Sequence, residues 1–224
     1  SDSLFIFGGE EHLISVFDGA GCRWDTTIFV DQPPPIEVRF RDGLQFITAK
    51  EIQLGDTSYQ IISDISSVVP VDSFYWSPLD SLRPANSLRP FVGQLLRPTT
   101  YTLTVIDENG CTGAGSILID VDRNRNVFIP NIFSPNGDGV NDELRIFTGV
   151  GVGTIKSIQL FDRWGEVLVS QTNVSPVGGE NGLVVWDGMH NGKKMNPAVF
   201  VYLVEVEFID NITLLYRGDV TLVR

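Results

Sequence analysis

Residues 12–31 read HLISVFDGAGCRWDTTIFVD and align without gaps with YTLTVIDENGCTGAGSILID, residues 101–120. Six of the twenty aligned positions are identical, among them Asp18/Asp107, Gly21/Gly110 and Cys22/Cys111. Each copy alternates apolar and polar residues, passes through a glycine-containing loop and then alternates again. This pattern predicts a β-hairpin in each copy.

The repeat also predicts the domain organisation. Its offset of 89 residues is the size of a small β-sandwich. We expect residues 1–32 to be the last hairpin of a domain whose beginning is missing, and residues 33–122 to form a complete domain. Pro33–Pro35 makes a stiff extended joint between them, because proline fixes φ and removes amide donors. A short polar linker at Asp122–Arg125 then separates a third domain, residues 126–224.

The fold class predicted for the chain is all-β, with tandem immunoglobulin-like β-sandwich domains followed by a C-terminal β-sandwich. Trp76 is expected to pack between the sheets of the middle domain. The predicted strands are Ile36–Phe40, Glu51–Leu54, Tyr59–Ile62, Ser73–Trp76, Tyr101–Asp107, Ser116–Val121, Val127–Ile132, Glu143–Phe147, Ile155–Asp162, Glu166–Ser170, Gly182–Trp186, Ala198–Phe208 and Ile212–Val223.

Composition narrows the possible functions. The 224 residues carry a net charge of −12 and the pI is about 4.5, which argues against nucleic-acid binding. No apolar run is long enough for a transmembrane helix, and no signal peptide is visible, so we expect a fragment or a mature piece. Cys22 and Cys111 could each be one half of a disulfide whose partner is absent, or a buried free thiol. The second interpretation is favoured for Cys111.

The middle domain resembles a known type of repeat. The runs Tyr75–Pro78, Pro98–Val105 and Asp107–Cys111 are similar to the PKD-like, immunoglobulin-like repeats of large bacterial surface proteins. The resemblance covers residues 33–121 fully and residues 1–32 in part. It implies a spacer or adhesive stalk.

The last hundred residues resemble a second family. The residue strings that carry the resemblance are Phe128–Asp142, Phe161–Glu166, Trp186–Gly188 with Asn191–Gly192, Pro197–Tyr202 and Tyr216–Arg224. They are similar to the gliding-motility-associated C-terminal domain, the type B sorting domain of the type IX secretion system in Bacteroidota. Ala198 departs from the family, which commonly has glycine there.

This resemblance implies a non-catalytic secretion and surface-anchoring signal of a cell-surface protein, with a gliding adhesin as the expected carrier. The implied partners are the type IX translocon and an outer-membrane barrel of the SprF/PorP-like kind, and the implied location is the cell surface, attached to the outer membrane. The final strand could offer an edge for strand addition to such a partner, or could merely complete the sandwich. The candidate partner-binding residues are Tyr216, Arg217, Gly218, Asp219, Val220, Thr221, Leu222, Val223 and Arg224.

The loop Ser134–Arg145 is a candidate calcium site. Ser134, Asn136, Asp138 and Asp142 fall at ligand positions of the EF-hand pattern, and Gly139 falls at its glycine. Arg145, however, occupies the place of the bidentate glutamate. The competing interpretation is an Asx- and glycine-rich turn that caps its own backbone.

Enzymatic activity is not expected, because the chain has no HExxH, GxSxG, glycine-rich phosphate loop or CxxC motif. Of the two histidines, His12 lies in a predicted strand of the truncated domain and His190 lies beside the Asn191-Gly192 turn. Trp24, Trp164 and Trp186 suit either a sugar platform or the covering of a sandwich end, and the second interpretation is favoured. An alternative function for the chain is therefore a calcium-assisted, glycan-binding adhesin module.

Overall fold

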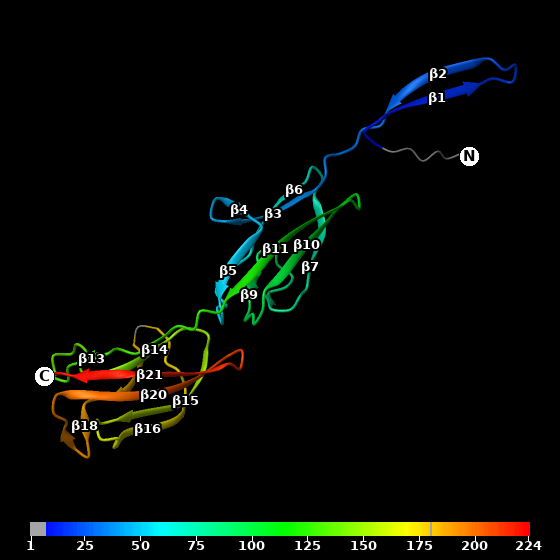
Figure 1. Cartoon of the computed structure of the whole chain (residues 1–224). Coiled ribbons are helices and arrows are strands. Elements are labelled where there is room, and N and C mark those ends of the chain that lie inside the picture. The colour runs from blue at the N-terminus through cyan, green and yellow to red at the C-terminus, as the bar shows by residue number, and fades with distance from the viewer. Residues whose placement is uncertain (1–7, 180) are drawn as a thin grey trace.

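The structure is a computed structural model, and it describes residues 8–179 and 181–224. Every regular element in this part is a β-strand, which confirms the all-β prediction. The strands form an N-terminal hairpin, a middle unit and a C-terminal unit that follow one another along the molecule (Figure 1). The exact limits predicted for three domains stay a prediction.

The predicted hairpins are confirmed in both copies of the repeat. The first consists of β1 (Glu11–Phe17) and β2 (Arg23–Phe29), and the second of β10 (Thr99–Asp107) and β11 (Thr112–Asp122). His12 pairs with Ile28 and Tyr101 with Ile117, so that the two hairpins have the same register. Residues 1–7, at the start of the predicted first domain, lie outside the described residues.

The middle unit is a sandwich around one apolar core. Trp76 is only 2% exposed there and its indole N–H donates to the carbonyl of Ser87 at 2.9 Å, as predicted for a core tryptophan. One sheet has the order β4-β3-β6 and the other β5-β11-β10-β7, with β8 and β9 as a separate pair. Their bounds are β3 Glu37–Asp42, β4 Gln45–Ile47, β5 Ala49–Gln53, β6 Ile62–Ser66, β7 Val71–Ser77, β8 Leu82–Arg83 and β9 Phe91–Val92.

The C-terminal unit has a second, separate core. A three-stranded sheet, β12-β14-β17, faces a five-stranded sheet, β13-β21-β20-β15-β16, and β18 and β19 form a small hairpin. The bounds are β12 Val127–Phe128, β13 Ile132–Phe133, β14 Leu144–Thr148, β15 Val152–Phe161, β16 Val167–Val174, β17 Leu183–Trp186, β18 Met189–His190, β19 Lys193–Lys194, β20 Ala198–Phe208 and β21 Thr213–Leu222.

Most predicted strands differ from the observed strands by a few residues at their ends, and two of them are wrong in more than an end position. The strand predicted at Tyr59–Ile62 begins only at Ile62, because the residues before it bond to another segment: Ile61 N–H donates to the carbonyl of Pro90. The strand predicted at Val127–Ile132 is broken into β12 and β13 around Pro130, which has no N–H for a ladder bond. Each half then joins a different sheet.

The same type of five-residue turn closes three of the hairpins. In the turn at Asp107, the Oδ1 atom accepts the N–H groups of Asn109 and Cys111 at 2.9 and 2.8 Å. The turns that begin at Asp18 and Asp162 repeat both bonds, with a glycine of positive φ at the fourth place. Such Asx turns are satisfied locally and need no support from the core.

The same turn explains the state of the cysteines. Cys22 and Cys111 are the fifth residues of their turns, where the N–H points to the aspartate and the side chain lies outside the sandwich. Both are free and exposed, so the interpretation of Cys111 as a buried thiol is wrong.

Candidate functional site

The long hairpin β20–β21 carries the predicted partner-binding residues. They alternate between the two faces of the sheet: Val220 and Leu222 are fully buried in the core, whereas Arg217, Asp219 and Arg224 are exposed. Tyr216 is half-buried and its hydroxyl donates to the carbonyl of Arg125 at 3.2 Å. The buried members therefore complete the sandwich, and only the alternate residues are accessible to a partner.

The final strand, β21, lies at the edge of its sheet along only part of its length. The two-residue strand β13 pairs in parallel with Thr221 and Leu222, and Val223 N–H donates to the carbonyl of Phe133 at 3.1 Å. From Thr213 to Asp219, β21 has ladder partners in β20 alone among the described residues. An added strand therefore has room beside the first part of β21, rather than beside its C-terminal end.

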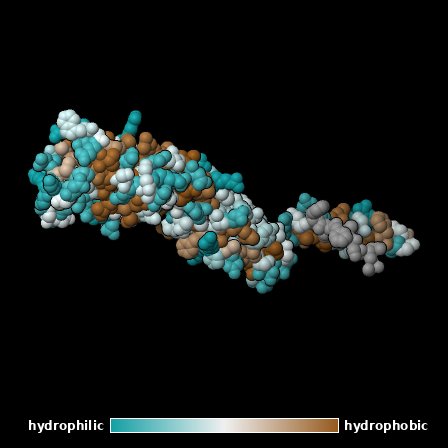
Figure 2. Space-filling view, turned by 90° about the horizontal axis from the view of Figure 1, so that it is seen from below, coloured by the Kyte–Doolittle hydropathy of each residue, from teal (hydrophilic) through white to brown (hydrophobic). Residues whose placement is uncertain are grey.

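The outer face of the five-stranded sheet is apolar for a surface. Val199, Val201 and Leu215 are 51%, 46% and 60% exposed, and β20 and β21 place all three on this face. Val167 of β16 pairs with Phe161, which in turn pairs with Val201, so the apolar strip crosses from β20 to the far edge at β16. On β21 the residue opposite Val201 is Asp219, and Leu215 lies further along the strand, opposite Glu205. Brown patches on the C-terminal unit and on the N-terminal hairpin are visible in Figure 2.

The candidate calcium loop is held by its own side chains. The carboxylate of Asp142 accepts the N–H groups of Gly137 and Gly139 at 2.7 and 2.8 Å, and these bonds lower its pKa. Asn136 and Asp138 each accept a backbone N–H two residues further on. No cluster of three or more Asp, Glu, His or Cys side chains suited to a metal occurs within residues 8–179 and 181–224. Ser134 donates its backbone N–H to the carbonyl of Asn141. Calcium binding by this loop stays a prediction.

The three tryptophans considered as a sugar platform lie apart. Trp186 is 4% exposed and packs between Phe133 and Phe200 in the core of the C-terminal unit. Trp24 is 63% exposed on β2, and Trp164 is 83% exposed in the turn that begins at Asp162. The prediction that they cover sandwich ends is wrong for Trp24 and Trp164, because both side chains are mostly exposed to solvent.

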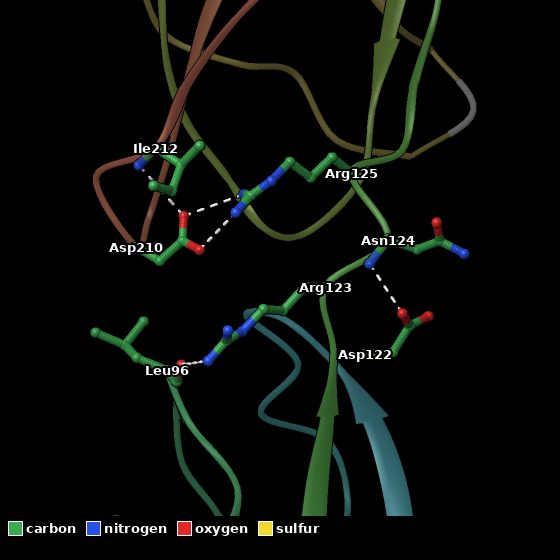
Figure 3. A network of polar contacts seen from close by, with 7 residues as sticks. All are labelled: Leu96, Asp122, Arg123, Asn124, Arg125, Asp210 and Ile212. Atoms are coloured by element: carbon green, nitrogen blue, oxygen red, sulfur yellow. Dashed lines mark hydrogen bonds and ion pairs between the residues drawn. The ribbon is translucent and has the colours of Figure 1, made fainter.

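The linker between the middle and C-terminal units makes polar contacts with both of them (Figure 3). Both terminal nitrogens of Arg125 donate to the carboxylate of Asp210, at 3.1 and 2.7 Å. The side chains are only 16% and 13% exposed. The Arg125 guanidinium also lies 4.6 Å from the ring centre of Phe208. The bond from Arg125 lowers the pKa of Asp210, and the carboxylate raises the pKa of Arg125.

Apolar and close backbone contacts accompany that ion pair. Ile209, at the tip of the β20–β21 hairpin, packs against the core of the middle unit. A Cβ on Gly55 would lie 2.5 Å from the carbonyl oxygen of Val150, so a glycine is required where the units meet. On the other side of the linker, Arg123 donates to the carbonyl of Leu96 at 3.2 Å. The predicted polar linker thus has binding partners in both units.

No catalytic arrangement was predicted, and the absence of catalysis stays a prediction. His12 lies in β1, and His190 lies in β18 with its Nε2 3.5 Å from a carboxylate oxygen of Glu166. In the described residues there is no helix with the length and apolar character of a membrane span.

Known structures share the strand architecture at low similarity. Dimeric latent PorU from Porphyromonas gingivalis is 13% identical with a TM-score of 0.29, covering 95% of this chain and 24% of PorU. The immunoglobulin domains 1–5 of Sidekick-1 are 10% identical with a TM-score of 0.44, covering 91% and 42%. Fibronectin(III)-like modules of Clostridium thermocellum CbhA are 14% identical with a TM-score of 0.30, covering 83% and 93%. At these scores the likenesses support no functional conclusion.

A family model gives a more specific result. No curated protein is a detectable relative of the chain. Residues 127–220 match the CHU_C type IX secretion signal domain, from the first residue of β12 to the buried Val220 in β21. The matched range contains nearly all of the second core. The C-terminal unit of this chain is therefore a CHU_C type IX secretion signal domain.

Proposed function

We propose that the chain is the C-terminal part of a secreted adhesin, and that its secretion signal domain also anchors the protein at the outer membrane. The observation that carries this proposal is the match of residues 127–220 to a type IX secretion signal. The anchoring partner would be an outer-membrane barrel of the SprF/PorP-like kind, as the resemblance described above implies. The middle unit would act as a PKD-like spacer.

The outer face of the five-stranded sheet is the surface that best fits this partner. It exposes Val199, Val201 and Leu215, and apolar side chains gathered on one face of a monomer are typical of interaction sites. The free stretch of β21 from Thr213 to Asp219 borders the same face. A partner could thus combine backbone pairing at the edge with apolar contacts on the sheet.

The distribution of charge supports separate roles for the two parts of the chain, a spacer and a docking domain. Residues 126–224 contain 7 basic and 11 acidic side chains, a net of −4 out of −12 for the chain. The remaining negative charge lies on the hairpin and the middle unit, where it suits a soluble extracellular spacer. The less acidic signal domain meets less electrostatic repulsion at an acidic partner or membrane surface.

The export assay compares surface variants of the whole chain in a host that has the type IX translocon. The double variant Val199→Asp/Val201→Asp places two charges on the outer face. We expect this variant to fold but no longer to be retained on the cell surface. Val68→Asp in the middle unit, where Val68 is 72% exposed, is the matched control. Equal surface display of all three proteins would contradict the proposed docking face.

The partner is tested separately by co-purification with the SprF/PorP-like barrel that is encoded in the same host. We expect the barrel to retain the full chain and to lose it when residues 126–224 are removed. Retention of the truncated chain would show that the middle unit, and not the signal domain, binds the barrel.

A further inference from the structure

A pocket lies at the end of the C-terminal unit that points away from the middle unit, beside β18 (Figure 1). It has a volume of about 500 Å³ and is open to solvent. One wall is the turn at Asp162–Trp164, and the other is the β18–β19 hairpin with the residues that follow it to Phe200. Of the side chains that line the pocket, the proposed secretion function uses only Val199.

Trp164 is held in an exposed position by the turn itself. Its N–H donates to Oδ1 of Asp162 at 2.8 Å, and Gly165 follows with a φ of 84°. The side chain is 83% exposed, and the guanidinium of Arg163 lies 5.9 Å from its ring centre. The turn fixes the backbone of Trp164, and its exposed ring offers a flat apolar face to a ligand.

The pocket is basic in an acidic protein. Arg163, Lys193 and Lys194 line the pocket. The two lysines are half of the four in the chain. Oδ1 of Asp162 is taken by the N–H groups of Trp164 and Glu166, and Glu166 lies beside His190. No ion pair to Arg163, Lys193 or Lys194 occurs among the described residues, so their charges are available to a ligand.

Two amides complete the lining. Asn191 and Asn196 both line the pocket and are exposed. An amide offers one acceptor and two donors, which suits the hydroxyl groups of a sugar. A flat aromatic ring, several cations and neutral amides around one cavity favour a polyhydroxylated ring that carries an anionic group over a plain acidic peptide, which would use the cations alone.

We propose that this pocket binds an acidic sugar, a unit of a polysaccharide or glycolipid that carries a carboxylate or phosphate. The sugar ring stacks on Trp164, Lys193 and Lys194 hold the anionic group, and the amides of Asn191 and Asn196 bond the hydroxyls. The signal domain would then contact a surface glycan as well as its protein partner. This proposal does not depend on the proposed secretion function.

The test measures binding of the full chain to alginate oligosaccharide by calorimetry. Trp164→Ala and the double variant Lys193→Gln/Lys194→Gln should each weaken the affinity at least about tenfold. Two control variants should bind as the unchanged chain does. Trp24→Ala removes another exposed ring, on β2, and Arg89→Gln/Arg97→Gln removes the same charge from exposed positions. Thermal unfolding of every variant checks that the fold is intact.

Three ligand controls define the site. Neutral dextran should bind far more weakly than alginate, because it lacks the anionic group, and polyglutamate should bind weakly because it lacks the ring. Phosphatidylcholine vesicles with and without a glucuronosyl glycolipid distinguish a membrane source of the sugar from a free polysaccharide. Undetectable alginate binding, equal binding of polyglutamate, or unchanged binding by Trp164→Ala would overturn the proposal.

Discussion

Two tyrosines of the middle unit, the fully buried Tyr101 and the partly buried Tyr59, differ in the hydrogen bonding of their hydroxyl groups. Tyr101 is fully buried and its hydroxyl donates to the carbonyl of Asp80 at 2.9 Å, whereas the buried hydroxyl oxygen of Tyr59 has no hydrogen-bond partner. Burial raises the pKa of Tyr59 to about 12, and the charge of Asp42 adds to this shift. An unpaired buried hydroxyl costs free energy that a paired one does not.

The pair gives a prediction for stability. Tyr101→Phe should lower the free energy of unfolding by about 1 kcal/mol or more, because it leaves the Asp80 carbonyl without its donor. Tyr59→Phe should leave the free energy unchanged or raise it by up to about 1 kcal/mol, because it removes an unsatisfied group. Urea titration measures both, and an equal loss in the two variants would contradict the assignment.

The ion pair between Arg125 and Asp210 makes part of the stability depend on pH. The bond from Arg125 lowers the pKa of Asp210 below its ordinary value in the folded chain. This contribution is therefore complete above the ordinary pKa and is lost as the pH falls through the lowered one. Arg125→Gln should cost roughly 1.5–3 kcal/mol at neutral pH and progressively less in acid. A cost that stays constant down to the acid limit would contradict this.

At the scale of elements, the Asx turn is the unit that recurs. Asp162→Ala removes the acceptor of two backbone N–H groups, so it should destabilise the signal domain by about 1–2 kcal/mol. Because Oδ1 alone accepts both bonds, Asp162→Asn should recover most of that loss. Chemical denaturation compares the two variants, and an Asn variant as unstable as the Ala variant would show that the charge, not the bonds, matters.

Sequence reasoning was most successful for these local elements. Alternation around a glycine-containing loop predicted a hairpin in both copies of the repeat, and β20 was predicted residue for residue. The two-residue strands β8, β9, β18 and β19 were missed, because two residues are too few to show an alternating pattern. β13 was not separated from β12, because its pairing with β21 comes from a distant segment. The Trp164 pocket was missed for the same reason, since the turn and the β18–β19 hairpin meet only in the folded unit.

At the scale of the molecule, the junction couples the middle unit to the signal domain. No spacing in sequence links Arg125 to Asp210, 85 positions away, and a polar linker alone predicts a flexible hinge. The contact of Ile209 with the middle core and the close approach at Gly55 instead favour a fixed arrangement. A rigid stalk would hold the signal domain at a defined orientation towards its receptor.

The rigidity can be tested in solution. Ile209→Asp puts a charge into the apolar contact and should broaden the distribution of interatomic distances in small-angle X-ray scattering. Ile212→Asp, three residues away and 46% exposed, is the matched control and should scatter like the unchanged chain. A distribution unaffected by Ile209→Asp would show that this contact does not fix the units.

Residues 126–224 should be sufficient by themselves to direct type IX secretion. The direct measurement is the location of a fluorescent reporter fused ahead of residues 126–224, in an otherwise identical pair of hosts with and without the type IX translocon. We predict that the reporter reaches the outside of the cell only where the translocon is present. A reporter retained in the periplasm of both hosts, or exported by both, would contradict the claim.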